Sequence, residues 1–358
     1  MQAMVLTGHG DLDAYEWNET WPMPQPAAGE VRLKVLACGL NNTDVNTRSG
    51  WYSKAVSDAT TGGAFDEVDE EDPTWGGNPI TFPRIQGADV CGIVDAVGEG
   101  VDAALIGQRV LTDNWLRNWD APMDYDQIGY FGSERDGGFA QYTTIPATNI
   151  GVIKSDYTDA ELATFSCSYS TAEGMLVRAN VGAGDSVLVT GASGGVGSAL
   201  VQLAKRRGAT VIALASEAKH DAIRALGADH VLPRAPADLK ASLAKATGRD
   251  SVTVVADIVG GPYFGTVIDA LASGGRYTCS GAIAGPIVDL DLRTFYLRDL
   301  TFTGSTVLPL HVFGDLIGYI ERKEIRPVVA ATYPLKDLKE AQAAFISKQH
   351  VGNIVVVP

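Results

Sequence analysis

The residues best suited to chemistry lie in a glycine-rich turn in the second half of the chain. The turn follows an apolar run at 187–189 and leads into an apolar, helix-like stretch that begins at Val196. Such a turn presents backbone N–H groups and the positive end of a helix to a phosphate. Gly194 would let the backbone approach a pyrophosphate, and Gly197 would let the helix pack closely on the strand. The sequence therefore predicts a dinucleotide site at Gly191, Gly194, Gly195, Val196 and Gly197.

The residues at the end of the next predicted strand, 210–214, indicate which dinucleotide is bound. A ribose 2′-hydroxyl is usually held by a carboxylate at this point, whereas a 2′-phosphate needs small polar and basic groups. The sequence places Ser216 and Lys219 there, and Arg234 could add a second cation. Glu217 could instead bind a ribose, but the basic residues favour NADPH as the cofactor.

Two kinds of segment position these residues. From Asp185 to about residue 300, strand-like and helix-like stretches alternate, which is typical of a parallel sheet covered on both faces. The first 150 residues instead contain short strands punctuated by Gly and Pro. A helix at 311–322 and a strand at 353–357 follow, and we expect this tail to return to the first domain. The prediction is an α/β chain with a β-rich domain at 1–155, completed by 301–358, and a dinucleotide-binding domain at 156–300.

Composition excludes several classes of protein. The net charge of −15 and the lack of a basic stripe argue against a nucleic-acid partner. No apolar run approaches the roughly 18 to 20 residues of a membrane span, and Met1–Thr7 does not resemble the start of a secretory signal. The four cysteines form no Cys-x-x-Cys pair, so we expect neither a disulfide framework nor a structural zinc site. A cytoplasmic protein with a small-molecule substrate is the expectation.

Two stretches have the character of insertions. Residues 53–81 are acidic and glycine-containing, and residues 112–137 are aromatic. Either they are surface loops, or they form walls of a substrate cleft, because long loops on a rigid scaffold often carry binding residues. The aromatic residues of the second stretch are Trp115, Trp119, Tyr125, Tyr130 and Phe131.

Landmarks along the whole chain resemble the medium-chain dehydrogenase/reductase superfamily. Besides the glycine turn, they include Gly39-Leu-Asn-Asn-Thr-Asp44, Gly87-Ala-Asp-Val-Cys-Gly92, Gly137-Gly-Phe-Ala-Gln-Tyr142, Leu226-Gly-Ala-Asp229 and Asp257-Ile-Val-Gly-Gly261. The resemblance implies a GroES-like catalytic domain interrupted by a Rossmann domain. It also implies that Thr171, Val259 and Gly281 contact the cofactor, and that edge strands at 277–281 and 300–304 pair across a two-fold axis in a homodimer.

The zinc ligands of the alcohol dehydrogenases in this superfamily are not retained. The first cysteine ligand corresponds to Asn41 here, the histidine ligand to Ala88, and the second cysteine ligand to Cys167. The single thiolate of Cys167 cannot form a catalytic zinc site. The resemblance therefore points to the branch of quinone oxidoreductases and enoyl reductases, which uses no metal. Asn353 replaces a lysine that is common in this branch, so a contact from the tail to the cofactor is not implied.

Within that branch, Asn41, Asp44, Gly50 and Tyr52 match a segment in which the tyrosine donates a proton. The resemblance assigns Tyr52 as proton donor, although it could merely line the cleft. Asn41 is then expected to position the substrate or cofactor, and Asp44 to orient the neighbouring backbone.

The resulting hypothesis is an NADPH-dependent, zinc-free oxidoreductase that transfers a hydride to an enone, a quinone or an enoyl thioester. Since no basic cluster suits the phosphates of coenzyme A, a free enone or quinone is favoured. The alternatives are a carbonyl or alcohol oxidoreductase of the same fold, and a non-catalytic NADPH-binding sensor.

Overall fold

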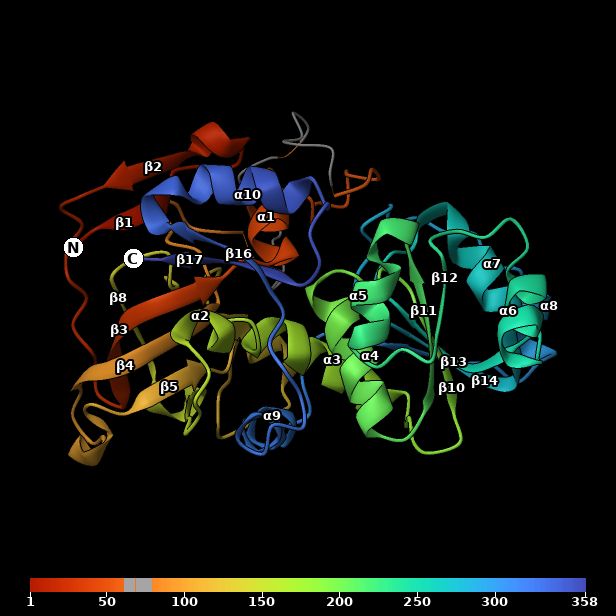
Figure 1. Cartoon of the computed structure of the whole chain (residues 1–358). Helices are drawn as coiled ribbons and strands as arrows, with labels where there is room; N and C mark the ends of the chain where they lie inside the picture. The colour runs from red at the N-terminus through yellow and green to blue at the C-terminus, as the bar shows by residue number, and fades with distance from the viewer. Residues whose placement is uncertain (61–67, 69–78) are drawn as a thin grey trace. The chain divides into compact units, whose positions relative to one another are not determined.

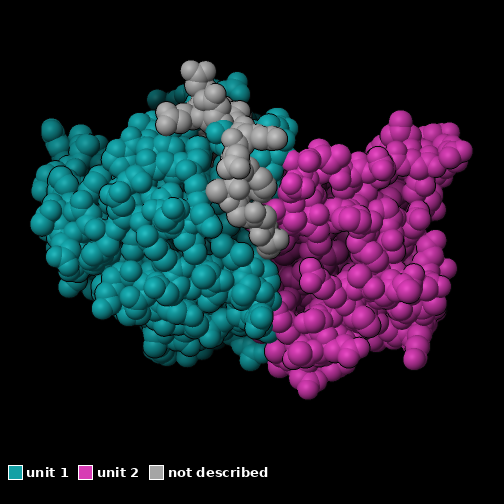
Figure 2. Space-filling view, turned by 90° about the horizontal axis from the view of Figure 1, so that it is seen from above, with its two compact units in different colours: residues 1–56, 62–167, 310–358 teal, residues 57–61, 168–309 magenta. Residues whose placement is uncertain are grey.

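The chain forms two compact units in the computed structural model, which describes residues 1–60, 68 and 79–358. Unit 1 consists of residues 1–56, 62–167 and 310–358, and unit 2 consists of residues 57–61 and 168–309 (Figure 2). The boundaries therefore fall later than the 155/156 and 300/301 junctions expected from the sequence. The second difference has a clear cause, because strand β15 (Thr301–Gly304) pairs with β14 (Leu271–Cys279) in the sheet of unit 2.

Among the described residues, unit 1 is built on a seven-stranded sheet. Its order is β16-β17-β3-β4-β5-β9, with β8 also pairing with β3. The strands are β3 (Glu30–Gly39), β4 (Asp89–Val97), β5 (Arg109–Thr112), β8 (Tyr142–Pro146), β9 (Ile150–Val152), β16 (Val329–Pro334) and β17 (Asn353–Val357). Alternate side chains of β3, from Val31 to Val35, are buried, as expected for a strand with one face on the core.

The C-terminal tail completes unit 1, as expected from the sequence. Strand β17 pairs antiparallel with β3, joining Val355 to Gly39, and helix α9 (Val312–Glu321) precedes it. Helix α10 (Leu338–Ile346) and the first strand, β1 (Ala3–Leu6), are both labelled in Figure 1. Leu338 and Phe345 of α10 belong to the same hydrophobic core as β1.

Unit 2 contains a six-stranded parallel sheet in the order β12-β11-β10-β13-β14-β15. The remaining strands are β10 (Ser186–Val189), β11 (Thr210–Ala215), β12 (His230–Pro233) and β13 (Val252–Asp257). The connecting helices are α4 (Gly195–Arg206), α5 (His220–Ala225), α6 (Leu239–Thr247) and α7 (Phe264–Asp269). The strand order reverses between β10 and β13, which is the point where a Rossmann sheet binds its dinucleotide. The predicted α/β fold with a GroES-like and a Rossmann domain is confirmed.

One of the two predicted edge strands is wrong. Residues 277–279 belong to β14, which lies between β13 and β15, so of these two segments only β15 lies at an edge of the described sheet. Both segments are rich in β-forming residues, and their local pattern does not distinguish an inner strand from an outer one.

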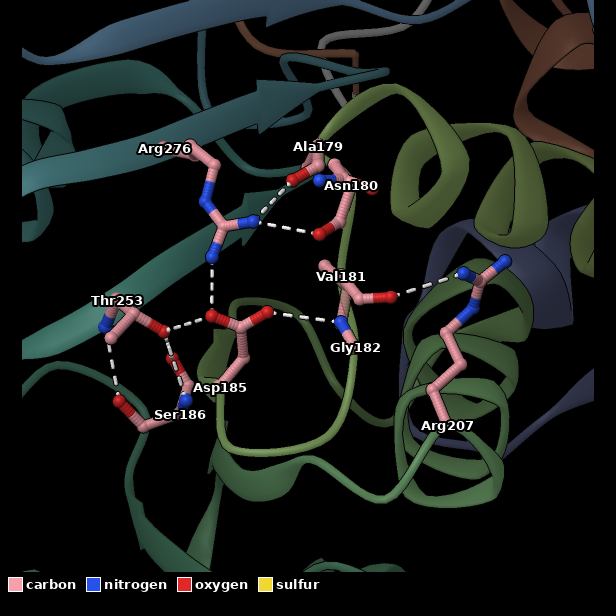
Figure 3. Close-up of polar contacts among 9 residues, drawn as sticks. All are labelled: Ala179, Asn180, Val181, Gly182, Asp185, Ser186, Arg207, Thr253 and Arg276. Atoms are coloured by element: carbon pink, nitrogen blue, oxygen red, sulfur yellow. Dashed lines mark hydrogen bonds and ion pairs between the residues drawn. The ribbon is translucent and has the colours of Figure 1, made fainter.

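Polar contacts fasten the connection between helix α3 (Ser166–Arg178) and β10 (Figure 3). The Arg276 guanidinium donates to the Ala179 carbonyl at 2.9 Å and forms an ion pair with Asp185. The Thr253 hydroxyl donates to the same carboxylate at 2.8 Å. Arg276 thus satisfies the Ala179 carbonyl just beyond the C-terminal end of α3, and Asp185 is held by both Arg276 and Thr253.

The structure describes the aromatic insertion and only part of the acidic one. Most of the acidic insertion lies outside the described residues. In the aromatic insertion Trp115, Tyr130 and Phe131 are buried, whereas Trp119 and Tyr125 are exposed. None of the described helices is both long and apolar enough to cross a membrane.

Candidate active site

Helix α1 (Asn42–Ser49) presents the first group of predicted residues in unit 1. Asn41 caps the helix, and its backbone N–H donates to Asp44 Oδ2 at 2.7 Å. Asp44 also accepts a backbone hydrogen bond from Gly87. The carboxylate of Asp44 thus joins α1 to the segment that leads into β4. The helix ends at Gly50, whose φ of 74° is left-handed and favours glycine.

Asp89, the first residue of β4, is the hydrogen-bonding centre of this region. Its Oδ1 accepts from the Cys167 backbone N–H at 2.8 Å and from Asn114 Nδ2 at 2.9 Å. The side-chain amide of Asn41 also lies close enough to lower the pKa of Asp89. Three other segments, at Asn41, Asn114 and Cys167, therefore converge on one carboxylate that is 1% exposed.

Burial raises the pKa of both carboxyl groups. The pKa of Asp44 is raised to about 7, and that of Asp89 to about 6, in each case first because burial disfavours the charged form. The negative charge of Asp89 raises the pKa of Asp44 further. Hydrogen bonds to both groups oppose the shift. A proton is therefore retained in this region closer to neutral pH than in an ordinary aspartate.

Tyr52 follows the Gly50 turn and remains partly exposed. Burial raises the pKa of its phenol well above the usual value, and the polar Asn46 side chain lies near enough to lower this pKa. Asp44 and Cys167 lie near enough to raise it again. Tyr52 thus keeps its proton over the ordinary pH range, as a proton donor must.

The sequence analysis assigned no site role to three residues of this cluster, Asp89, Asn114 and Tyr130. The Tyr130 hydroxyl lies 3.4 Å from Asn114 Nδ2 and also hydrogen-bonds to the Cys167 side chain. The Tyr130 ring packs against Trp115 with 5.1 Å between the ring centroids. Its aromatic character indicated a wall of a cleft, but nothing in the local sequence indicated that it would meet Cys167.

The structure places Asn41, Asp89 and Cys167 together without the chemistry of a zinc site. Two of the three positions that hold the metal in alcohol dehydrogenases are occupied here by Asn41, which has an amide group, and Ala88, which has only a methyl group. Neither is an anionic or imidazole ligand that zinc prefers. Among the described residues, no three His, Cys, Asp or Glu side chains are grouped to hold a metal ion. The donor set does not fit catalytic zinc.

The glycine turn of unit 2 connects β10 to α4. Gly191 has a φ of 56°, and Gly194 caps the helix. A side chain at Gly197 would place its Cβ 2.2 Å from the Gly191 carbonyl oxygen, so only glycine fits there. A Cβ at Gly194 would meet nothing nearer than 3.8 Å, which leaves room beside the backbone. The N–H groups of Gly195 and Val196, in the first turn of α4, lack intrahelical partners and suit a phosphate.

A second loop at the same end of the parallel sheet contains Val259. Asp257, at the end of β13, accepts from the Val259 backbone N–H at 2.8 Å and from the Thr190 hydroxyl at 2.5 Å. The Tyr277 hydroxyl donates to its other oxygen at 2.8 Å. Asp257 thus holds the loop in place, a role that the sequence analysis did not predict although it gave Asp257 as part of a family motif. Gly281 follows β14, the next strand of the sheet.

The predicted phosphate-binding residues lie beyond β11 and β12. Lys219 Nζ donates to Ser193 Oγ in the glycine turn at 3.3 Å. Burial lowers the pKa of Lys219, and the charge of Arg234 lowers it further, so these two cations lie near each other. Ser216, directly after β11, is exposed, as is Glu217. Thr171, the remaining predicted contact, lies half-buried on α3.

Two known domain families match this chain, one mainly in unit 1 and the other mainly in unit 2. Residues 27–155 match the alcohol dehydrogenase GroES-like domain, and residues 195–322 match the zinc-binding dehydrogenase domain. A putative alcohol dehydrogenase from Sinorhizobium meliloti 1021 is 47% identical, with a TM-score of 0.89 over 100% of this chain and 96% of that one. The chain belongs to the medium-chain dehydrogenase/reductase superfamily.

The chain is also similar to two proteins whose names state an activity or a cofactor. The acryloyl-coenzyme A reductase of Metallosphaera sedula is 27% identical over 366 residues, 99% of either chain. A mycobacterial protein in complex with NADPH is 27% identical, with a TM-score of 0.78 over the full length of both chains. The chain is therefore an oxidoreductase with an NAD(P)-binding Rossmann domain, as the sequence predicted.

Proposed function

We propose that this oxidoreductase is an NADPH-dependent, zinc-free reductase of activated carbon–carbon double bonds or quinones. The observation that carries the proposal is the cluster in unit 1. Asn41, Ala88 and Cys167 occupy the positions of the metal ligands. The protonated phenol of Tyr52 lies near Cys167. Without a metal to bind an alcoholate, alcohol oxidation lacks its electrophile, whereas reduction of a conjugated bond needs only a hydride and a proton.

Bound NADPH would supply a hydride to the β-carbon of the substrate. Residues Gly191, Gly194, Gly195, Val196 and Gly197 would hold its pyrophosphate. Thr171, Val259 and Gly281 are proposed to contact it as well. Tyr52 would then give its O–H proton to the α-carbon of the resulting enolate and recover a proton from solvent, since its side chain is partly exposed.

The remaining residues of unit 1 position this chemistry. Asp44 fixes the backbone of Asn41 through its 2.7 Å hydrogen bond. We propose that the side chain of Asn41 positions the substrate. The preference for NADPH rests on Lys219, Arg234 and Ser216, because two neighbouring cations favour a 2′-phosphate over a ribose hydroxyl.

The substrate is proposed to be a free enone or a quinone. The similarity to acryloyl-coenzyme A reductase favours an activated double bond, and an enoyl thioester therefore remains a candidate. The alternative of a carbonyl reductase is supported by the 47% identity to a putative alcohol dehydrogenase.

The proposal can be tested by measuring NADPH oxidation as the decrease in NADPH absorbance. The substrates should include a cyclic enone, a benzoquinone, an acryloyl thioester and the saturated ketone that matches the enone. We expect turnover of the conjugated compounds with the carbonyl group retained in the enone product. Faster reduction of the saturated ketone would favour the carbonyl reductase, and tight NADPH binding without turnover would favour a sensor.

A further inference from the structure

Helix α1 is buried although it has almost no apolar side chains. Residues 44–49 are all buried, and Val45 is the only one of these six with an apolar side chain. Because apolar packing is non-directional and has so little surface here, hydrogen bonds must determine the rotation of α1. This rotation matters for the site, since Asn41 caps the helix at one end and Tyr52 follows the Gly50 turn at the other.

A series of hydrogen bonds leaves α1 at Arg48 and returns to it at Asp44. Arg48 Nε donates to Gln342 Oε1 of α10 at 3.1 Å, and Gln342 Nε2 donates to the Tyr15 hydroxyl at 2.8 Å. The Tyr15 hydroxyl donates to Gln86 Oε1, and Gln86 Nε2 donates to the Asp44 carbonyl at 3.1 Å. Since Asp44 and Arg48 are about one helical turn apart, the series closes on α1. We call its four side chains, which are each at most 1% exposed, the α1 network: Arg48, Gln342, Tyr15 and Gln86.

The direction of every hydrogen bond in the α1 network is determined by Arg48. A guanidinium cannot accept, so the Gln342 amide turns its oxygen toward Arg48 and its N–H toward Tyr15. The Tyr15 oxygen accepts that bond, which leaves the phenol proton for Gln86 and the Gln86 N–H for the carbonyl of α1. Burial raises the pKa of Tyr15, so the phenol keeps the proton that it donates. Reversing one amide would place two acceptors or two donors face to face.

We propose that Gln342, in the C-terminal tail, is a positioning residue for the active site in unit 1. By connecting Arg48 to Tyr15 it fixes the rotation of α1, and thereby the places of Asn41 and Tyr52. In this role Gln342 acts only through the other members of the α1 network. The inference rests on the proposed function, in which Asn41 positions the substrate and Tyr52 protonates the enolate.

Gln342→Glu separates the direction of these bonds from the packing of the side chain. Glutamate has nearly the same shape and can still accept from Arg48, but it has no N–H for Tyr15. The Tyr15 hydroxyl would then donate to the new carboxylate and leave Gln86 without its donor. The new carboxylate would also pair with Arg48, whose ion pair with the largely exposed Asp11 is long, at 3.5 Å. We therefore expect little change in thermal stability but a displaced α1.

Two measurements on Gln342→Glu test the proposal, one of activity and one of hydrogen–deuterium exchange. With the cyclic enone, kcat should fall about 10-fold while KM for NADPH stays the same, because a small displacement of catalytic groups is enough to slow a reaction. Amide exchange should become about 10-fold faster in peptides that cover 42–52. It should not change in strand β3, which provides the reference within the same unit.

A double-mutant cycle with Tyr15→Phe distinguishes this role from two independent defects. Tyr15→Phe keeps the ring but removes the hydroxyl, so it should also lower kcat. Since both substitutions break the same series of bonds, Gln342→Glu should have no further effect on kcat in the Tyr15→Phe protein. Gln202→Glu is the matched control, because Gln202 Nε2 of α4 donates to another buried phenol, that of Tyr169, at 2.9 Å in unit 2. This control should leave exchange in 42–52 unchanged.

Several results would overturn the inference. Unchanged kcat and exchange in Gln342→Glu would show that other contacts hold α1. Faster exchange in 42–52 with unchanged kcat would show that the α1 network has no part in the reaction. Equal acceleration in β3 would show a general loss of stability, and additive losses in the cycle would show that Gln342 and Tyr15 act independently. Should Gln342→Glu not fold, Tyr15→Phe must by itself slow turnover and speed exchange in 42–52, and native values would refute the proposal.

Failure of the proposed function would be recognised separately. A native protein that reduces no compound of the panel would overturn that function. The exchange measurement needs no substrate, so faster exchange in 42–52 would still support the action of Gln342 on α1, and unchanged exchange would refute it.

Discussion

The backbone N–H of Cys167 donates a 2.8 Å hydrogen bond to the carboxylate of Asp89. This bond joins the first turn of α3 to the first residue of β4. Cys167 occupies one of the positions that correspond to zinc ligands in alcohol dehydrogenases, and Asp89 directly follows another, Ala88. Cys167 is therefore held in place by protein groups, with the Tyr130 hydroxyl bonded to its side chain. The cluster is organised by hydrogen bonds that need no metal.

Purified protein should accordingly contain less than stoichiometric zinc and should retain its activity after chelation. The reason is that the amide of Asn41 and the methyl group of Ala88 cannot replace a thiolate and an imidazole. Metal analysis of the protein, with activity assayed before and after treatment with a chelator, checks this. One zinc per chain, together with activity that disappears on chelation and returns with zinc, would contradict it.

Lys219→Ala should weaken NADPH binding and leave NADH binding almost unchanged. Lys219 lies near Arg234, so its removal takes away one of two cations available to a 2′-phosphate. A hydrogen bond to a charged group contributes about 1.5–3 kcal/mol, which corresponds to a loss of about 10-fold or more in affinity. Calorimetric titration with each dinucleotide measures the effect.

Lys245→Ala is the matched control for this experiment. Lys245 is exposed in the last turn of α6, away from the strand ends that carry the predicted site. The Lys245→Ala variant should bind NADH and NADPH with the same affinities as the native protein. Equal affinity of the native protein for NADH and NADPH would remove the basis of the preference.

Stability should decrease as the pH rises from about 4 to about 7, in part because of Asp44. Its pKa is raised to about 7 in the folded protein and is about 3.9 in an unfolded chain. In this interval the folded state binds the proton more tightly, so each increase in pH favours unfolding, by at most about 1.4 kcal/mol per pH unit.

Urea unfolding of the native protein and of Asp44→Asn between pH 4.5 and 8 isolates this contribution. The free energy of unfolding of the native protein should fall relative to that of the variant as the pH rises, and the difference should become constant above the pKa of about 7. A difference that does not vary with pH would show that Asp44 ionises at the same pH in both states.

We predict a homodimer that forms through strand β15. This strand is at the edge of its sheet, and unpaired edges invite association. The preceding segment exposes apolar side chains, including Leu292 at 64% and Leu297 at 68%. Light scattering at micromolar concentration should give twice the chain mass, and Leu292→Asp combined with Leu297→Asp should give the monomer. Leu310→Asp, at an exposed leucine of unit 1, should leave the dimer intact.

Local pattern explains which features the sequence could predict. The turn from Gly191 to Gly197 was found because strand, glycines and helix are contiguous. Asp89, Asn114 and Tyr130 meet only through folding, since 25 and 16 residues separate Asn114 from its two partners. Asp89 did carry a signal, because it directly follows the vacant ligand position at Ala88. The place of β14 inside the sheet could not be predicted, because the residues that pair with it lie elsewhere in the chain.

Tyr52→Phe should slow the reduction of an enone or an enoyl thioester about 10²–10⁴-fold, the usual contribution of a positioned acid. The substitution removes only the hydroxyl group, so the ring contact with Trp51, at 5.7 Å between centroids, can persist. NADPH affinity should remain nearly unchanged, because the cofactor residues belong to unit 2.

Quinone reduction by the same preparation should suffer less, because the oxygens of a hydroquinone can take protons from solvent. This comparison separates the loss of an acid from a general folding defect, which would lower both activities equally. A solvent deuterium isotope effect on enone reduction should accompany the phenol proton transfer in the native protein. If Tyr52→Phe retains full enone reductase activity with chemistry shown to limit the rate, the tyrosine only lines the site, and the proton must come from water.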